Sequence, residues 1–193
     1  MTVENKKVPV GISNRHIHLT TADIATLFGS GASLTHKKDL GQPGQFAAEE
    51  VVTLVGPKGK LEGVRVLGPA RSKSQVEVSQ TDAFKLGIKP PVRDSGKLDG
   101  TPGMEIIGPA GKLTLAEGVI IAARHIHMHT TEAEAFGLKD QDRVKVVVPG
   151  ERGLVFDNVL IRSGATHKLE FHVDTDEANA CMLANGVEVN IIK

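Results

Sequence analysis

Aromatic side chains and an excess of either charge are what this sequence lacks most clearly. It has six Phe and no Trp or Tyr, whereas proteins that bind single-stranded nucleic acid stack the bases on aromatic side chains. Lys and Arg number 23, as do Asp and Glu, so no net field attracts the protein to nucleic acid or to an anionic membrane. No apolar run approaches the roughly 20 residues of a membrane helix. We therefore expect neither a nucleic-acid partner nor a membrane partner.

Cysteine is almost absent as well. A single residue, Cys181, excludes an internal disulfide framework and fits a reducing compartment. Residues 1–7 are polar and lack the apolar stretch of a signal peptide. We expect a cytoplasmic protein.

Short segments separated by turns dominate the 193 residues, which suffice for one compact body or two small barrels. The 21 Gly and nine Pro favour many strands over long helices. We predict a hairpin of residues 51–55 and 61–67, and strands at residues 75–78, 104–107, 119–127, 143–148, 154–161, 168–173 and 187–192.

Four short helices are predicted from their capping signals. The first three are indicated by Thr20 with Asp23, Ser79 with Asp82, and Thr131 with Glu134, and the fourth starts at Asp174 or Thr175. We expect each helix to stop at a glycine, namely Gly29, Gly87, Gly137 and Gly186. The polar, glycine-rich residues 29–45 look like a flap or lid, and residues 90–102 like a linker.

Two six-residue segments of the chain are closely similar. Residues 14–19 (NRHIHL) match residues 123–128 (ARHIHM), and in both copies threonines and a helix signal follow. This predicts two related halves that each carry the same motif.

Paired histidines in a His-x-His pattern are the strongest chemical signal. Residues i and i+2 of a strand point to the same face, so His16 projects with His18, and His125 with His127. Two such imidazoles can close on one zinc ion. A single pair is more often a polar strand face, but two copies in matching contexts favour metal binding.

A catalytic zinc usually has three protein ligands and one open position. His172 and Glu77 lie on the polar faces of predicted strands and could complete the two sets, although each alone is more often a solvated residue than a ligand. We predict that His36, in the flap, His129, at a helix start, and His167, on the opposite strand face from His172, are not ligands.

Several long motifs together resemble the PduL-type phosphate acyltransferases, also called phosphotransacylases or phosphate propanoyltransferases. They are residues 8–19 (VPVGISNRHIHL), 64–71 (VRVLGPAR), 75–77 (QVE), 123–128 (ARHIHM) and 171–179 (FHVDTDEAN). The resemblance covers nearly the whole chain.

The resemblance implies a mainly β fold of two small β-barrels capped by short α-helices, with the active site at their interface. By this pattern, residues 8–14 with 118–193 form one barrel, and residues 15–28 with 46–95 form the other. Residues 29–45 would then be the flap, and residues 96–117 a linker region.

The resemblance also implies two zinc ions per chain and roles for particular residues. His16, His18 and Glu77 would hold one zinc, and His125, His127 and His172 the other. Arg71 would bind phosphate, although from the sequence alone it could be a surface charge. Contacts to coenzyme A would come from Ile12, Ser13, Asn14, Lys58, Arg65 and Asn179.

The implied reaction converts acyl-CoA and phosphate to acyl phosphate and CoA, with a short acetyl or propanoyl group. Two alternatives stay open: a dizinc hydrolase of a thioester or amide, and a non-enzymatic zinc-binding module. Family members in bacterial microcompartments carry an amphipathic N-terminal segment, and seven residues before Val8 are too few for one. We therefore expect no microcompartment shell partner, and the sequence leaves the oligomeric state open, a homodimer included.

Overall fold

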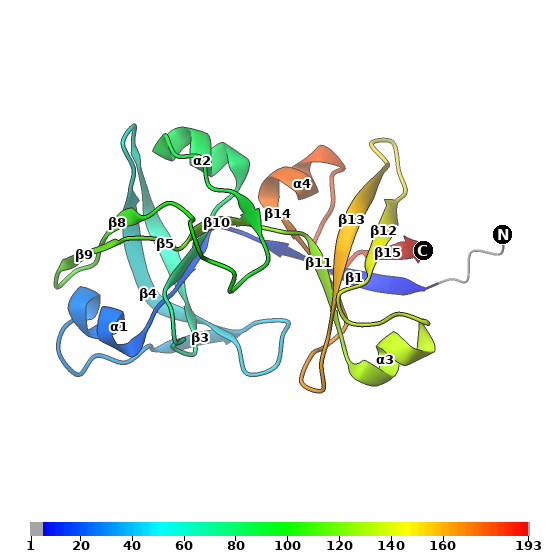
Figure 1. Ribbon diagram of the computed structural model, residues 1–193, viewed down its shortest axis with the longest axis horizontal. Coiled ribbons are helices and arrows are strands. Elements are labelled where there is room, and N and C mark those ends of the chain that lie inside the picture. The colour runs from blue at the N-terminus through cyan, green and yellow to red at the C-terminus, as the bar shows by residue number, and fades with distance from the viewer. Residues whose placement is uncertain (1–5, 193) are drawn as a thin grey trace. The chain divides into compact units, whose positions relative to one another are not determined.

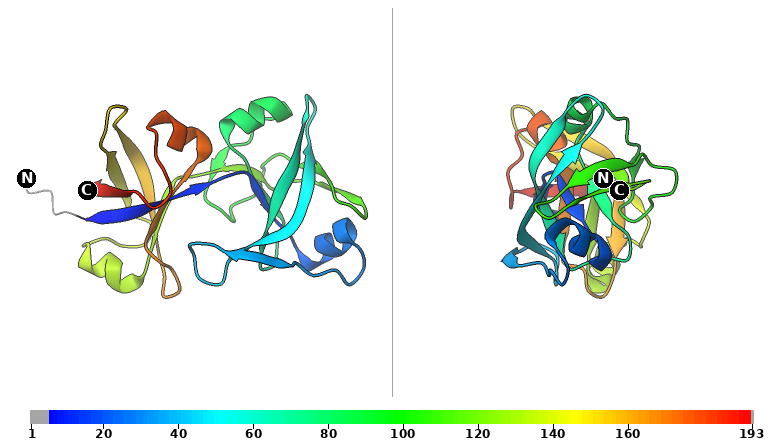
Figure 2. Two further views of the ribbon diagram at one scale, coloured as in Figure 1. Left: turned by 180° about the vertical axis from the view of Figure 1, so that it is seen from behind. Right: turned by 90° about the vertical axis from the view of Figure 1, so that its left-hand side faces the viewer.

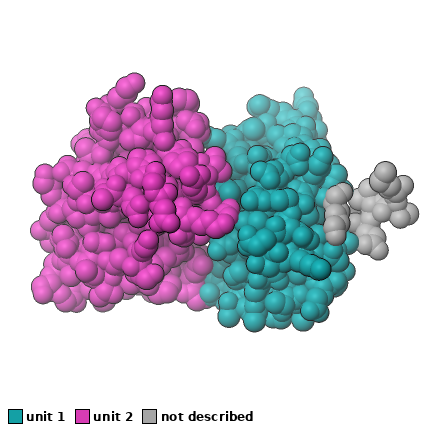
Figure 3. Space-filling model, in the orientation of Figure 1, with its two compact units in different colours: residues 1–13, 41–43, 123–193 teal, residues 14–40, 44–122 magenta. Residues whose placement is uncertain are grey.

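The computed structural model describes residues 6–192 of the chain. Residues 1–5, which bear on the expectation of no encapsulation helix, lie outside the described residues. The chain divides into two compact units (Figure 3). Unit 1 comprises Met1–Ser13, Gly41–Pro43 and Ala123–Lys193, and unit 2 comprises Asn14–Leu40 and Gly44–Ala122.

Unit 1 is a closed six-stranded barrel in the order β1-β14-β11-β13-β12-β15. The first strand of the chain, β1, lies between two of its last strands, parallel to β14 and antiparallel to β15 (Figures 1 and 2). The strands are β1 (Lys7–Ser13), β11 (His125–Met128), β12 (Arg143–Val148), β13 (Leu154–Ser163), β14 (Glu170–Asp174) and β15 (Glu188–Ile192). Two short helices, α3 (Thr130–Ala135) and α4 (Thr175–Ala180), follow β11 and β14. The core includes the fully buried Ile126, Met128 and Phe171.

Unit 2 is a curled nine-stranded sheet in the order β7-β10-β6-β2-β5-β4-β8-β9, with β3 paired to β4. Its strands are β2 (His16–His18), β3 (His36–Asp39), β4 (Phe46–Val55), β5 (Lys60–Gly68), β6 (Gln75–Glu77), β7 (Val92–Arg93), β8 (Met104–Ile107), β9 (Lys112–Leu115) and β10 (Val119–Ala122). The helices are α1 (Thr21–Phe28) and α2 (Gln80–Leu86). The core includes the fully buried Ile17, Leu54 and Ile106. The predicted mainly β fold with short helices is confirmed.

The two copies of the repeated motif occupy the same local topology. In unit 2, β2 is antiparallel to β6 and parallel to β5. In unit 1, β11 is antiparallel to β14 and parallel to β13. A short helix follows β6 in one unit and β14 in the other. The repeat seen in the sequence therefore extends to the surrounding strands and helices.

The structure confirms three of the predicted N-caps and corrects the fourth, and one predicted helix stop is also wrong. Thr20 and Ser79 cap α1 and α2 as predicted. The third helix is capped by His129 with Glu132, and not by Thr131 with Glu134, because the chain leaves β11 and turns at His129. Asp174 caps the fourth helix, which does not run on to Gly186. It ends at Ala180 with Cys181 as its C-cap, and the next residue, Met182, has the left-handed conformation with φ 57°.

Three segments differ from the predicted elements. Residues 119–127 form two strands, β10 and β11, because the chain passes from unit 2 into unit 1 between them. Residues 29–45, expected as a flap, contain β3. Residues 96–117, expected as a linker region, contain β8, which matches the strand predicted at residues 104–107, and β9, which was not predicted. All four residues of β3 are exposed and polar, so the strand shows no apolar alternation. It is defined only by its backbone pairing with β4.

The longest of the described helices, α1, has eight residues, so none of them could span a membrane.

Candidate metal centres and active-site residues

The first predicted ligand set comes together in unit 2, on the antiparallel strands β2 and β6. His16 lies directly opposite Glu77 in the pairing register, and His18 lies opposite Gln75. One ligand atom from each of His16, His18 and Glu77 falls within 4.8 Å of the other two. Both histidines are buried, while Ile17 between them packs into the core on the other face. The pleat of a three-residue strand thus aims both imidazoles at one carboxylate.

Neighbouring groups set the protonation of these two rings. His16 Nδ1 lies 2.8 Å from the Asn14 carbonyl, which can only accept, so this nitrogen carries the proton and Nε2 faces Glu77 at 3.5 Å. Burial opposes the charged form of His16, but the Glu77 carboxylate and the hydrogen bond to Asn14 together raise its pKa. Burial, with repulsion from His16 and Arg71, lowers the pKa of His18 to about 3. His18 is therefore a neutral imidazole at neutral pH, the form that binds metals.

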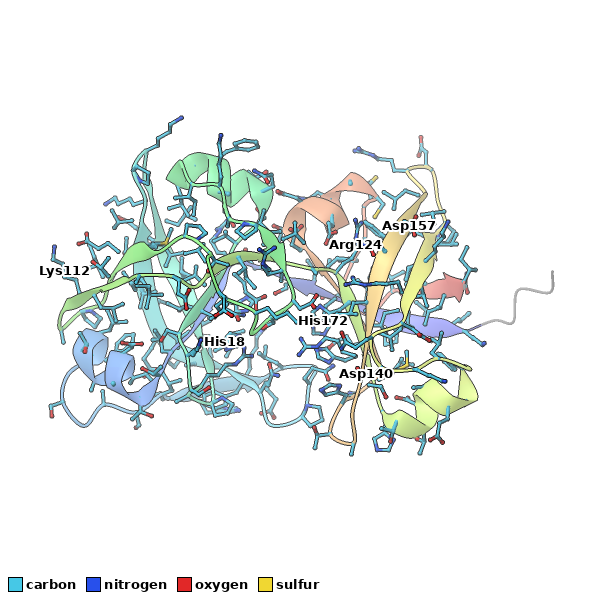
Figure 4. The ribbon with its side chains drawn as sticks, in the orientation of Figure 1. His18, Lys112, Arg124, Asp140, Asp157 and His172 are labelled. Atoms are coloured by element: carbon cyan, nitrogen blue, oxygen red, sulfur yellow. The ribbon has the colours of Figure 1, made fainter. Side chains whose placement is uncertain are left out.

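The second predicted set comes together in unit 1, on β11 and β14. His125 lies opposite His172 in the register, and the ring centroids of His172 lie 4.9 Å from His125 and 5.1 Å from His127. Again one ligand atom from each residue falls within 4.8 Å of the other two. Burial, followed by repulsion from His125 and His172, lowers the pKa of His127 to about 2. Figure 4 marks one residue of each set, His18 and His172.

Both sets fit a cation such as zinc. Nε2 of His125 lies 3.1 Å from Nε2 of His127, and two ligand atoms at about 2.0–2.1 Å from a tetrahedral zinc are separated by about 3.3 Å. His125 Nδ1 donates to the Ala123 carbonyl at 2.8 Å, which leaves the Nε2 lone pair for a metal. In the second histidine of each pair, His18 and His127, Nδ1 is buried and has no hydrogen-bond partner among the described residues. A cation could satisfy the unpartnered Nδ1 of His18, whereas in His127 the nitrogen that faces His125 is Nε2, so its Nδ1 does not count toward the same ion.

Two residues beside the second set were missed by the sequence analysis, namely Glu170 and Gln42. Glu170 Oε2 lies 2.6 Å from His172 Nε2. This hydrogen bond lowers the pKa of Glu170, and its effect is larger than the opposing effect of burial. Gln42 Nε2 donates to the same carboxylate oxygen at 3.1 Å. Glu170 precedes His172 by two residues in one strand, so their shared face was readable from parity. Gln42 lies 128 residues from Glu170, and no sequence pattern connects them.

The second residue of each repeated motif is an arginine that pairs with the helix after the third ligand. Arg15 contacts Asp82 in the first turn of α2, and Arg124 lies 3.4 Å from Glu177 in the first turn of α4. Burial raises the pKa of Glu177. These ion pairs tie the start of each histidine strand to the helix that follows its partner strand.

Arg71, the candidate phosphate ligand, lies just after β5. Its backbone N–H donates to the Leu19 carbonyl at 2.8 Å, and its Nη1 lies 3.4 Å from Ser95 Oγ. Ser95 Oγ is in turn 3.2 Å from Glu77 of the first ligand set. The Arg71 charge also contributes to lowering the pKa of His18. The guanidinium is thus electrostatically coupled to the first candidate metal centre.

The candidate coenzyme A residues are distributed over both units. Ile12, Ser13 and Asn179 belong to unit 1, and Asn14, Lys58 and Arg65 to unit 2. Asn179 is exposed on α4. Arg65 Nη1 is held by the Ala48 and Glu49 carbonyls at 3.0 and 2.8 Å. Their assignment to one ligand stays a prediction.

The three remaining histidines that we weighed lie outside both ligand sets. His36 is exposed and contacts Asp39 at 2.8 Å, and His129 caps α3. His167 lies in the turn before β14, and not on a strand face as predicted. Its ring packs edge-on against His127 with centroids 4.5 Å apart, and its Nδ1 bonds the Arg162 carbonyl.

Comparison with known proteins gives one consistent result. The family model described as phosphate propanoyltransferase matches residues 9–184. The phosphate propanoyltransferase of Thermotoga maritima is 62% identical over 185 residues, which are 95% of this chain and 88% of that protein. Those of Rhodopseudomonas palustris and Escherichia fergusonii are 56% and 54% identical, over 99% and 92% of this chain and 84% and 85% of their own. With this similarity along nearly its whole length, the chain belongs to the phosphate propanoyltransferase family.

Proposed function

We propose that this protein is a zinc-dependent phosphate acyltransferase that interconverts acyl-CoA plus phosphate and acyl phosphate plus CoA. Family membership supports the reaction class, and a short acetyl or propanoyl chain is the proposed acyl group. The observation that carries the metal dependence is that two sets of candidate ligands, each with two buried histidines and one partly buried third member, occupy equivalent positions of the repeat. Such sets of three protein ligands are typical of catalytic zinc, which keeps one position open, whereas structural zinc is saturated by four.

In this proposal the two sets hold one zinc ion each. His16, His18 and Glu77 hold the first, and His125, His127 and His172 hold the second. When bound, zinc polarises a thioester carbonyl and stabilises a soft thiolate leaving group. The neutral imidazoles and their buried setting are what the chain itself contributes to this chemistry.

Arg71 has the role of orienting phosphate. Phosphate is already an anionic nucleophile at neutral pH, so the protein needs to place it rather than deprotonate it. A guanidinium offers two parallel N–H donors to two phosphate oxygens. The coupling of Arg71 to His16 and His18 supports its place beside the first centre. Ile12, Ser13, Asn14, Lys58, Arg65 and Asn179 are the proposed contacts to coenzyme A.

A steady-state assay of CoA release tests the reaction class. Acetyl-CoA and propanoyl-CoA are each supplied with and without phosphate, and both the thiol and the acyl phosphate are measured. We expect thiol release that saturates with phosphate and matches acyl phosphate one to one. Thiol release at the full rate without phosphate would contradict the proposal and favour the dizinc hydrolase. Zinc dependence is tested separately, by chelation and readdition of the metal.

A further inference from the structure

Four side chains, and not three, share one face of the paired strands in each candidate metal centre. In the first centre, His16 is opposite Glu77 and His18 is opposite Gln75. In the second, His125 is opposite His172 and His127 is opposite Glu170. The repeat therefore places Glu77 and His172 at equivalent positions, and Gln75 and Glu170 at equivalent positions.

The carboxylate occupies a different position in each of the two centres. The first centre has its carboxylate directly opposite a histidine, at Glu77, with a neutral amide two residues before it. The second has a third histidine there, and the carboxylate two residues before it. A hydrogen bond joins the two neighbours in both cases, at 2.5 Å from Gln75 Nε2 to Glu77 Oε1 and at 2.6 Å between His172 Nε2 and Glu170 Oε2. Each group of four side chains thus contains one carboxylate and therefore one negative charge.

The Glu170 carboxylate is closely surrounded by Gly11, Gly41 and Gln42. A Cβ on Gly11 would lie 2.8 Å from Glu170 Cδ, and a Cβ on Gly41 would overlap the carboxylate oxygens. Gln42, only 5% exposed, donates to Glu170 and to the Lys168 carbonyl, and accepts from the Lys168 backbone N–H. Both glycines therefore leave room for this one side chain, and the amide of Gln42 fixes its oxygen.

We infer that Glu170 is a positioning residue of the second metal centre. It orients His172, and it supplies beside that centre the negative charge that Glu77 supplies within the first. Because Glu170 contacts Nε2, His172 would offer Nδ1 to the metal in this arrangement. Metal-ligating histidines commonly have a carboxylate on their other nitrogen, which fixes the ring and strengthens the ligand. This inference rests on the two metal centres of the proposed function.

Zinc affinity at each centre, measured separately, tests this inference. Apoprotein carrying His16→Ala reports the second centre alone, and apoprotein carrying His125→Ala reports the first alone. Zinc is titrated into each in competition with a chelating dye. Glu170→Gln removes the charge and keeps the shape, while Gly41→Ala keeps every charge and displaces the carboxylate. Glu188→Gln, an exposed carboxylate on β15 of the same barrel, is the matched control.

Both test variants are expected to weaken zinc binding at the second centre by about 10–100-fold and to leave the first centre unchanged. Glu188→Gln should change neither. An affinity within twofold of the parent in both variants would overturn the inference, and so would equal weakening at both centres. A loss as complete as in His172→Ala would also overturn it, because Glu170 would then be a ligand. If the parent protein binds no zinc at either centre, the proposed function itself fails, and this inference with it.

Discussion

Arg15 donates from two nitrogens, Nε at 2.8 Å and Nη2 at 2.7 Å, to the same oxygen of Asp82, whose side chain is 3% exposed. The equivalent pair of the repeat is looser. Arg124 Nη1 lies 3.4 Å from Glu177, whose side chain is 24% exposed, and its guanidinium also covers the Phe156 ring at 5.3 Å. One motif is therefore anchored to a buried carboxylate and the other to a partly hydrated one.

This difference predicts unequal costs for the same substitution. Arg15→Ala leaves a buried carboxylate short of two charge-assisted hydrogen bonds and should lower the free energy of unfolding by about 2–3 kcal/mol. Arg124→Ala removes a partly exposed pair and a cation–π contact, and should cost about 1 kcal/mol. Urea unfolding of both variants gives the comparison. Equal costs would show that burial of the carboxylate does not decide the effect.

Zinc content is predicted to follow the ligand sets. Wild-type protein should contain about two zinc ions per chain, and His172→Ala about one. Activity in that variant should fall by more than about 100-fold, since the loss of a ligand costs at least as much as the loss of a residue behind one. Elemental analysis of purified protein measures the ratio. His36→Ala, an exposed histidine outside both sets, is the control and should retain both ions. Active protein without any transition metal would refute the two-zinc assignment.

Substitution of Arg71 by lysine tests its role toward phosphate. Lysine keeps the charge but not the two-pronged donor geometry, so the Michaelis constant for phosphate should rise or turnover should fall, by about 10–100-fold in total. The Michaelis constant for acyl-CoA should change much less, and zinc content should stay the same. Arg93→Lys makes the same exchange at an exposed position on β7 and should behave as wild type. An unchanged phosphate dependence in Arg71→Lys would remove Arg71 from the phosphate site.

The single thiol is predicted to take no part in acyl transfer. Cys181 is 6% exposed, its Sγ contacts the Glu177 and Ala178 carbonyls, and burial raises its pKa. A nucleophilic thiol requires the opposite, an exposed and acidified sulfur. Cys181→Ala should therefore keep activity within about threefold and lose about 1 kcal/mol of stability for the sulfur atom removed from the core. A thousandfold loss in a folded variant would point to an acyl-cysteine intermediate.

The residues that follow the equivalent helices α2 and α4 should respond in opposite ways to substitution. Gly87 after α2 and Met182 after α4 both have positive φ, 76° and 57°. Met182 is 73% exposed, so Met182→Gly loses little packing and should gain about 0.5–1 kcal/mol by relieving the left-handed backbone. Gly87→Ala should lose about 1–2 kcal/mol, because its Cβ would also crowd the Lys58 side chain. Chemical denaturation of the two variants should shift the midpoints in opposite directions.

Residues close in sequence were the ones whose arrangement could be predicted. The pairing of His16 with His18 follows from strand periodicity alone, as does that of His125 with His127. Strand periodicity named the third members, Glu77 and His172, only as candidates. Their assignment to one histidine pair or the other came from the family resemblance, since nothing local indicates which strand lies beside a histidine pair. The contacts of Asp82 with Arg15 and of Gln42 with Glu170 were beyond prediction, because the partners lie 67 and 128 residues apart.

Among the secondary-structure elements, β3 and the β10–β11 break escaped prediction for a related reason. Strand β3 is polar and exposed throughout, so only its backbone bonds to β4 define it. Residues 119–127 read as one apolar strand because β10 and β11 are both largely buried, and the sequence carries no sign that they belong to different sheets.

The position of β1 between β14 and β15 has a consequence for biosynthesis. A ribosome delivers β1 first and its two neighbours last, so the barrel cannot close until translation of residues 170–192 is complete. All of unit 2 is synthesised in that interval and needs no later segment for its own strand pairing. Pairings so distant along the chain are slow to form, and an unpaired strand is exposed to aggregation in the meantime. The nascent chain should therefore acquire protection from proteolysis in two steps, first in residues 14–122 and later in the barrel, once residues 170–192 have emerged from the ribosome.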